Sequence, residues 1–239
     1  MSQILGKIKW IVIVLVLLGG TAFAVSSLVD GYKENLDKEP EWVKKDPQNT
    51  YMGGDCAAKP VIYLYPSETT QVEVTLEYDG VLTCTYPSYE SGWKVVAQPD
   101  GTLMNLVDGQ TYSYLFWEGF DSIEYDFSSG FVVAGEDTME FLKEKLSYLG
   151  LTQKEYNEMI VYWLPKMQEN AYNLIAFQQE AYTEHARLTV TPQPDCVLRV
   201  FMTYIPLDEA IEVPEQELEP FVRSGFTVVE WGGSEIGKE

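Results

Sequence analysis

The sequence contains a single histidine, His185, and this scarcity limits the catalytic sites that it can build. A hydrolase triad or a multi-histidine metal site would have to be assembled around that one side chain. The nucleotide-binding patterns G-x-G-x-x-G and G-x-x-x-x-G-K-[ST], the hydrolase pattern G-x-S-x-G and the zinc-peptidase pattern H-E-x-x-H are all absent. The sequence therefore gives no support for nucleotide binding or zinc peptidase chemistry, and we predict no cofactor.

Cysteine is also scarce, with only Cys56, Cys84 and Cys196 in the chain. No C-x-x-C spacing is present, so a zinc site built on cysteine is not indicated, and an odd number leaves at least one thiol unpaired. One bridge, from Cys84 to either of the others, stays open, but we favour none. Alternation places Cys84 on the side of Leu82 and Tyr86, where a buried thiol would pack as a small apolar group.

Basic residues are few, because 16 Lys and Arg stand against 37 Asp and Glu, giving a formal net charge of -21. Such a charge repels phosphate backbones and anionic headgroups, so nucleic acid is excluded as an expected partner and cations or basic partners are favoured. A hydrophobic fraction of 46% and an aromatic fraction of 13% are too high for a disordered chain. A folded acidic body is predicted.

The N-terminal region, residues 1–29, contains an uncharged apolar run from Trp10 to Val29. A helix of about 20 residues is long enough to cross a bilayer. Because Lys7 and Lys9 precede the run, the positive-inside rule predicts a single-pass cell-membrane protein with its N-terminus in the cytoplasm and its domain outside. The alternative is a signal peptide cleaved near Ala24, which would make the protein secreted. We favour the anchor, since the apolar run continues past that site.

Residues 30–58 are polar and indicate a linker, whereas residues 59–236 carry the patterns of a single domain. Apolar and polar residues alternate over short runs separated by turn signals such as Asp79-Gly80, which is typical of a hairpin. The expected strands cover residues 61–65, 72–76, 81–86, 93–97, 102–106, 112–117, 172–177, 186–191, 197–204 and 226–231. Strands at this spacing predict an antiparallel sheet or sandwich-like layers.

Two consecutive helices interrupt the strand pattern. Met139, Leu142, Leu146 and Leu149 lie on one helical face, and Gly150 follows where a C-cap is expected. A capping box at residues 152–155 begins a second helix, which the proline at position 165 should end. The predicted fold class is therefore α+β, with mainly antiparallel sheet or sandwich-like layers and a two-helix insertion covering one face.

Three strings give the domain a specific signature: KPVIYLYP at residues 59–66, YLFWEG at 114–119 and VVEWGG at 228–233. They resemble an uncharacterised group of bacterial hypothetical proteins, and the resemblance covers roughly residues 59 to 236. It implies one intact domain and no known activity.

Two glutamates beside tryptophans form the first candidate site. Glu118 follows Trp117 and Glu230 precedes Trp231, each at the end of a predicted strand and close to glycine. Two carboxylates across a cleft could act as acid and base in glycoside cleavage, with the indoles stacking on sugar rings. The alternative, which we favour, is that the tryptophans are core residues and the glutamates are solvent-facing strand ends.

Further candidates are an acidic loop and a set of tyrosines. Asp121, Glu124 and Asp126 could hold calcium through their carboxylates, although no EF-hand spacing is present and a solvated loop is favoured. Tyrosines that alternate on neighbouring strands could form an exposed recognition face or could fill the core of a sheet. They are Tyr63, Tyr65, Tyr86, Tyr89, Tyr112 and Tyr114.

These features predict a membrane-anchored, extracytoplasmic binding or interaction module with a protein or glycan ligand, attached to the membrane through residues 10–29. The alternatives are a carbohydrate-active hydrolase using Glu118 and Glu230, and a purely structural envelope protein.

Overall fold

The chain divides into two units, Met1–Tyr51 and Met52–Glu239, and the computed structural model describes residues 56–237 of the second. The larger of its two sheets is built from β1 (Cys56–Tyr65), β3 (Val81–Tyr86), β7 (Leu115–Phe120), β8 (Phe131–Ala134), β9 (Tyr172–Gln178), β11 (Cys196–Leu207) and β12 (Thr227–Glu235). The smaller contains β2 (Thr70–Tyr78), β4 (Trp93–Ala97), β5 (Leu103–Asn105), β6 (Thr111–Tyr112) and β10 (Ala186–Thr191). The α-helices are α3 (Thr138–Tyr148), α4 (Gln153–Met167) and α5 (Glu180–His185).

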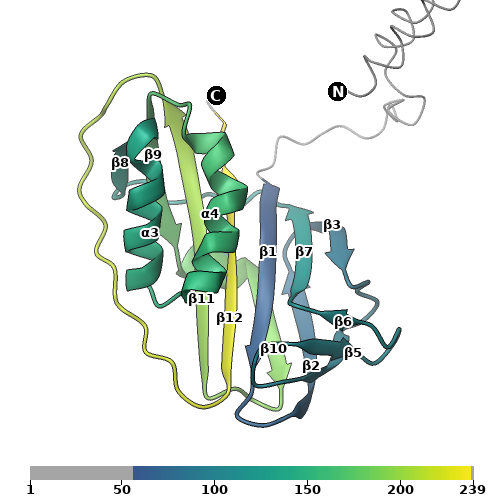
Figure 1. Cartoon of the computed structure of the whole chain (residues 1–239). Coiled ribbons are helices and arrows are strands. Elements are labelled where there is room, and N and C mark those ends of the chain that lie inside the picture. Colours follow the sequence, from purple (N-terminus) through teal and green to yellow (C-terminus); the bar gives the residue numbers. More distant parts are fainter. Residues whose placement is uncertain (1–55, 238–239) are drawn as a thin grey trace, which may run out of the picture. The chain divides into compact units, whose positions relative to one another are not determined.

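The two sheets are mostly antiparallel, which confirms the mixed α and β class with mainly antiparallel sheet. The larger has seven strands in the order β3-β7-β1-β12-β11-β9-β8, and the smaller has five in the order β10-β2-β4-β5-β6 (Figure 1). β11 and β12 form a parallel pair, whereas the other named pairs in the described residues are antiparallel.

One hydrophobic core lies between the two sheets. The smaller sheet contributes Val72, Val74 and Leu76, which are buried and alternate with polar residues, as the period-two pattern predicted. The larger sheet contributes residues such as Ile62 and Trp117 to the same cluster. The inner faces of the sheets therefore exclude water from each other, and this packing decides which side chains of the larger sheet are inaccessible.

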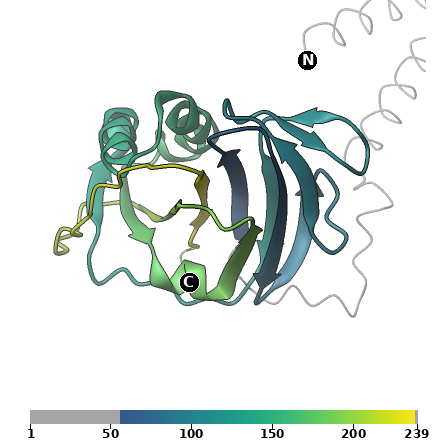
Figure 2. The same ribbon diagram turned by 90° about the horizontal axis from the view of Figure 1, so that it is seen from below.

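The other face of the larger sheet packs against α3 and α4. Leu142 and Leu146 of α3 and Met159 and Trp163 of α4 are buried in a second cluster, together with strand residues such as Val200. Both helices lie on one side of the sheet, near β9 and β11, while β1, β7 and β3 continue beyond them (Figures 1 and 2). The helices of residues 56–237 therefore cover only part of this face.

Two local predictions are wrong. Asp79-Gly80 does not close a hairpin, because β2 pairs with β10 and β4 in the smaller sheet whereas β3 pairs with β7 in the larger one. Since both edges of β2 are occupied, the chain crosses to the other sheet at this turn. Pro165 does not end α4, which continues to Met167. The carbonyl that loses its partner belongs to Val161, whose side chain is exposed, so water is near enough to replace the missing donor.

The predicted membrane-spanning helix over Trp10 to Val29, like most of the expected linker, lies outside the described residues. Among the helices of residues 56–237, none combines the length and apolar character needed to cross a bilayer. The longest, α4, has 15 residues, whereas a span needs about 20. The predictions of a transmembrane segment, of membrane attachment through residues 10–29 and of a single-pass cell-membrane location are corrected on this finding and are not carried further.

Gly150 occupies the position after α3 that the sequence indicated for a C-cap, with a φ of +97°. A Cβ there would approach the carbonyl oxygen of Phe221 to 2.8 Å. Replacing Gly150 by alanine should therefore lower the free energy of unfolding by about 1–2 kcal/mol, through the left-handed backbone and the contact together. Urea denaturation of the full chain measures this, and Gly109→Ala is the control because its φ is also positive, at +70°, with no atom within 4 Å of the added Cβ. Equal losses in the two variants would show that the contact with Phe221 adds nothing.

Candidate functional site

Trp117 and Glu230 lie together in the core between the two sheets, so Trp117 is a core residue as the favoured interpretation had it, whereas Glu230 does not face solvent. Both are fully buried, and the indole N–H of Trp117 donates to Oε1 of Glu230 at 3.1 Å. They come from β7 and β12, which lie on either side of β1. Glu230 is therefore inaccessible to a substrate and serves as a hydrogen-bond acceptor inside the core.

Arg199 of β11 neutralises the buried carboxylate. Its Nε donates to Oε2 of Glu230 at 2.6 Å, and its guanidinium carbon lies 4.7 Å from the ring centre of Tyr182 on α5. Burial would lower the pKa of Arg199, but the charge of Glu230 outweighs it and raises that pKa. The sequence analysis missed Arg199 and Tyr182, although an arginine within the apolar run of β11 was a signal that a partner charge is needed.

Glu118 and Trp231 lie on the opposite face of the same sheet. Successive residues of a strand point to opposite faces, so Glu118 and Trp231 turn away from the core that holds Trp117 and Glu230. Trp231 is buried under the helices, and Glu118 accepts the backbone N–H of Lys59 at 3.2 Å. The sheet thus separates the two glutamates, and the carboxylate pair required for glycoside cleavage is not assembled.

The acidic loop does not converge on a cation. Asp121 is buried and accepts the Tyr78 hydroxyl at 2.5 Å and the N–H of Ile123 at 3.1 Å. Burial raises the pKa of Asp121. Asp126 accepts hydrogen bonds from the N–H and hydroxyl of Ser128. Glu124 is exposed. Within residues 56–237 no group of three His, Cys, Asp or Glu side chains is arranged to hold a metal ion, so the structure adds no support for calcium.

His185 is the last residue of α5. Its Nδ1 lies 3.2 Å from Oδ2 of Asp79, and both side chains are exposed to more than a third of their area. In this solvent-facing position the pair has the surroundings of an ordinary surface contact.

Among the described residues, Lys59 is the non-glycine residue with a left-handed backbone. The ladders of β1 with β12 and with β7 both shift register between residues 57 and 61, and Lys59 has a φ of +54°. A non-glycine residue in this region is uncommon, and β-bulges redirect side chains. The neighbouring strand accommodates the bulge at Gly232, where a Cβ would lie 3.0 Å from Pro60. The local fold therefore places Lys59 in an orientation that a regular strand would not give it.

The ammonium group of Lys59 is held between two tyrosine rings. Its Nζ lies 5.7 Å from the ring centre of Tyr114 and 5.5 Å from that of Tyr162 on α4, both within cation–π range. Tyr63 lies behind them, edge-on to Tyr114 at 5.4 Å, and its hydroxyl donates to Glu158 at 2.8 Å. Burial, reinforced by that glutamate, raises the pKa of Tyr63 far above its usual range.

We call this surface the aromatic face. It combines half-buried rings, one ammonium group and two carboxylates, and its residues are Lys59, Tyr65, Tyr114, Phe116, Glu118, Glu158 and Tyr162. Tyr86, which is 60% exposed, and exposed Cys84 continue the same side of the sheet on β3, opposite Phe116 and Glu118. The expectation that Cys84 would be buried is wrong, because its side of β3 lies on the part of the sheet without a helical cover.

The six tyrosines divide between the two expected roles. Tyr63 is fully buried, whereas Tyr65, Tyr114 and Tyr86 lie on the side of the sheet that carries the aromatic face. Tyr89 packs on Trp93 with its hydroxyl bonded to Leu76, and Tyr112 packs on Tyr86. Part of the set therefore supports a core and part supports a surface.

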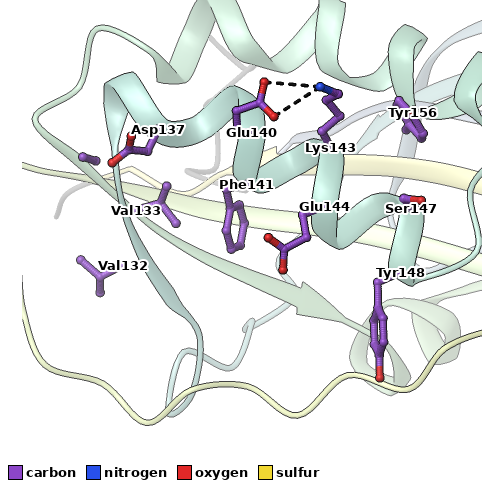
Figure 3. Close-up of a pocket in the computed structure, with 11 residues that line it drawn as sticks. Val132, Val133, Asp137, Glu140, Phe141, Lys143, Glu144, Ser147, Tyr148 and Tyr156 are labelled. Atoms are coloured by element: carbon purple, nitrogen blue, oxygen red, sulfur yellow. Dashed lines mark hydrogen bonds and ion pairs between the residues drawn. The ribbon is translucent and has the colours of Figure 1, made fainter.

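A groove of about 880 Å³ lies elsewhere, between β8 and α3 (Figure 3). Figure 3 shows Phe141 and Tyr148 among its walls with the acids Asp137 and Glu144, while Glu140 bonds Lys143 at 3.3 Å. None of its lining residues belongs to the aromatic face or to the candidates from the sequence.

Comparison with known proteins gives little functional information. No protein-family model matches the sequence, and no solved structure matches it. The chain is 48% identical over 64 residues to an "Uncharacterized protein in bglA 3'region" of Butyrivibrio fibrisolvens. The match covers 26% of this chain and 65% of that relative. The relative's description assigns it no activity, so the functional argument depends on the geometry of the site.

Proposed function

We propose that the protein is a non-catalytic binding module that recognises a glycan through the aromatic face. The observation that carries this proposal is the bulge of β1, which turns Lys59 between Tyr114 and Tyr162 while Glu118 accepts its backbone N–H. A distorted strand that arranges a cation and two rings at a half-exposed surface is a feature that packing alone does not require.

The mixture of groups favours a glycan over a protein surface. Sugars present hydroxyl groups that both donate and accept hydrogen bonds, together with apolar ring faces that can lie on aromatic side chains. Lys59 supplies a donor, Glu118 and Glu158 supply acceptors, and the tyrosines supply the rings. The centre of a protein–protein interface, in contrast, is depleted in charged residues.

The architecture supports the same assignment. We interpret α3 and α4 as an insertion between β8 and β9 that covers one part of the larger sheet and leaves β1, β7 and β3 open beside α4 (Figure 1). Tyr162 and Glu158 come from α4, so the helix forms one side of the aromatic face. The resemblance to the uncharacterised bacterial group stays a prediction and adds no ligand to this proposal.

Replacing Tyr114 by alanine should weaken glycan binding by about tenfold, which corresponds to the loss of one ring contact worth roughly 1.4 kcal/mol. The full chain would first be screened on an array of oligosaccharides and polysaccharides, and the strongest ligand titrated by calorimetry. Tyr148→Ala is the matched control, because Tyr148 is a 49% exposed tyrosine on α3. It should bind as the parent does.

Two results would count against this function. A screen in which no glycan is enriched would remove the ligand class, and equal affinity of the Tyr114→Ala and parent proteins would remove the site. Thermal unfolding of each variant should accompany the titration, so that a loss of binding is separated from a loss of fold.

A further inference from the structure

β11 extends beyond its neighbour β9 at one end. β11 begins at Cys196, but its ladder with β9 includes only residues from Phe201 onward, where Phe201 pairs with Gln178. On its other side β11 pairs with β12 from Cys196 to Tyr204. Among residues 56–237, no strand therefore pairs with residues 196–200 on the β9 side, and the shorter reach of β9 is visible in Figure 1.

The hydrogen bonds of β9 show which backbone groups face this open edge. The N–H and C=O of Phe177 both bond the side-chain amide of Gln216, at 2.9 and 2.8 Å, so they point away from β11. In an antiparallel ladder the residues on either side must then be the ones that bond the partner strand. Phe201 and Thr203 are accordingly the residues of β11 that face β9.

The same alternation, continued along β11, turns the backbone N–H and C=O of Val197 and Arg199 toward the open edge. The N–H of Cys196 bonds the carbonyl of Phe226 next to β12, which agrees with even-numbered residues facing the other way. Neither ladder of β11 shifts register, so odd-numbered residues face the β9 side and even-numbered residues face β12 along the whole strand. These two outward-facing residues thus present four backbone groups that have no backbone partner within residues 56–237.

A pocket of about 420 Å³ lies along this edge. Its apolar wall is formed by Leu149, Phe177, Leu198 and Phe221. The carboxylates of Glu180 and Glu219, both exposed, are also among its lining residues. The pocket therefore combines a strand edge with an apolar surface and negative charge.

We propose that this pocket binds an extended segment of another protein, which adds to β11 as a strand and carries a basic residue next to an apolar one. The backbone groups of Val197 and Arg199 provide the ladder, and alternate side chains of the added strand reach opposite sides of the sheet. Charge selects the partner: Glu180 and Glu219 attract a basic segment, whereas a second copy of this chain, at -21, is repelled. The site lies on elements other than those of the aromatic face and does not depend on the proposed glycan function.

The test uses two synthetic peptides with the full chain. Ac-Lys-Val-Lys-Val-Lys-amide should bind in fluorescence anisotropy and slow hydrogen exchange at the amides of Val197 and Arg199, while Ac-Glu-Val-Glu-Val-Glu-amide should not bind. Val197→Pro removes an outward-facing donor, a substitution that edge strands tolerate, and should weaken binding by about tenfold. Val197→Ala keeps the donor and should retain most of the affinity.

Charge reversal provides the second arm. Glu180→Lys and Glu219→Lys should each weaken binding of the basic peptide by about threefold to fivefold at low salt. Glu90→Lys, which reverses an exposed charge outside the pocket, should leave the affinity unchanged. The proposal is overturned by any of three results. They are no binding of the basic peptide at millimolar concentration, equal binding of both peptides, and an unchanged affinity of a folded Val197→Pro variant.

Discussion

Replacing Arg199 by methionine should lower the free energy of unfolding by about 3–5 kcal/mol. The carboxylate of Glu230 has no exposed surface, and removing Nε of Arg199, now at 2.6 Å, leaves it among the described residues with the indole N–H of Trp117 and the neighbouring Tyr182 hydroxyl, neither of which carries a positive charge. An ionised group left in this position loses its compensating charge and stays in the low-dielectric core. Equilibrium denaturation of the full chain in urea at pH 7 measures the loss.

A second substitution separates charge from packing. In Arg199→Met/Glu230→Gln the buried charge is gone, while the glutamine oxygen can still accept from Trp117, so at least about half of the lost stability should return. If the double variant is as unstable as Arg199→Met, the loss comes from contacts of the guanidinium, such as that with Tyr182, and not from an unpaired carboxylate. A loss below about 1 kcal/mol in the single variant would contradict the account altogether.

The fold was predictable where the pattern is local. Val72, Val74 and Leu76 alternate with polar residues and form the buried side of β2. The apolar residues at helical spacing from Met139 onward correctly predicted α3. β8 was missed because its four residues, FVVA, are all apolar and so show no alternation. The pairing of β2 with β4 and β10 is decided by the packing of two sheets, which a turn signal such as Asp79-Gly80 does not contain.

The candidate site was harder to predict because it depends on register. Adjacent residues of a strand point apart, so each glutamate beside a tryptophan had to lie on the other side of the sheet from its neighbour. Which glutamate would be buried follows from the order of β7, β1 and β12, and this order is not written in either segment. Lys59 carries no sequence signal for a left-handed backbone, since glycine is the usual residue there.

The second large effect concerns Arg223, which joins three segments of the chain. Its guanidinium donates to both carboxylate oxygens of Glu155 at the start of α4, including 3.0 Å from Nη1 to Oε1, and to the carbonyl of Gly150 at 2.8 and 3.0 Å. Burial would raise the pKa of Glu155, but Arg223 and the N–H of Thr152 outweigh it and hold that pKa below 4.5. The ionised form is thus the one that the fold stabilises.

Arg223→Met should therefore lower the free energy of unfolding by about 2–4 kcal/mol at pH 7, because the buried Glu155 loses its counter-ion. In the parent the lowered pKa contributes stability that is present above about pH 4.5 and is lost as the pH falls through the folded-state pKa. In the variant the same carboxylate is a penalty that protonation relieves. Because the unfolded chain titrates alike in both proteins, the difference between them should be largest at pH 7 and shrink as the pH falls toward the lowered folded-state pKa of Glu155 in the parent.

Urea denaturation at pH 7 and pH 4 tests this dependence, with Lys143→Met as the control. Lys143 pairs with Glu140 at 3.3 Å on the exposed side of α3, and its loss should cost less than about 0.5 kcal/mol at either pH. A cost of Arg223→Met that is the same at both pH values would assign the effect to the hydrogen bonds with Gly150, because those bonds do not titrate. A cost that decreases toward acid pH would assign the lost stability to the charge of Glu155. The ion pair between Arg223 and Glu155 would then be the contact that attaches the segment after β11 to the start of α4.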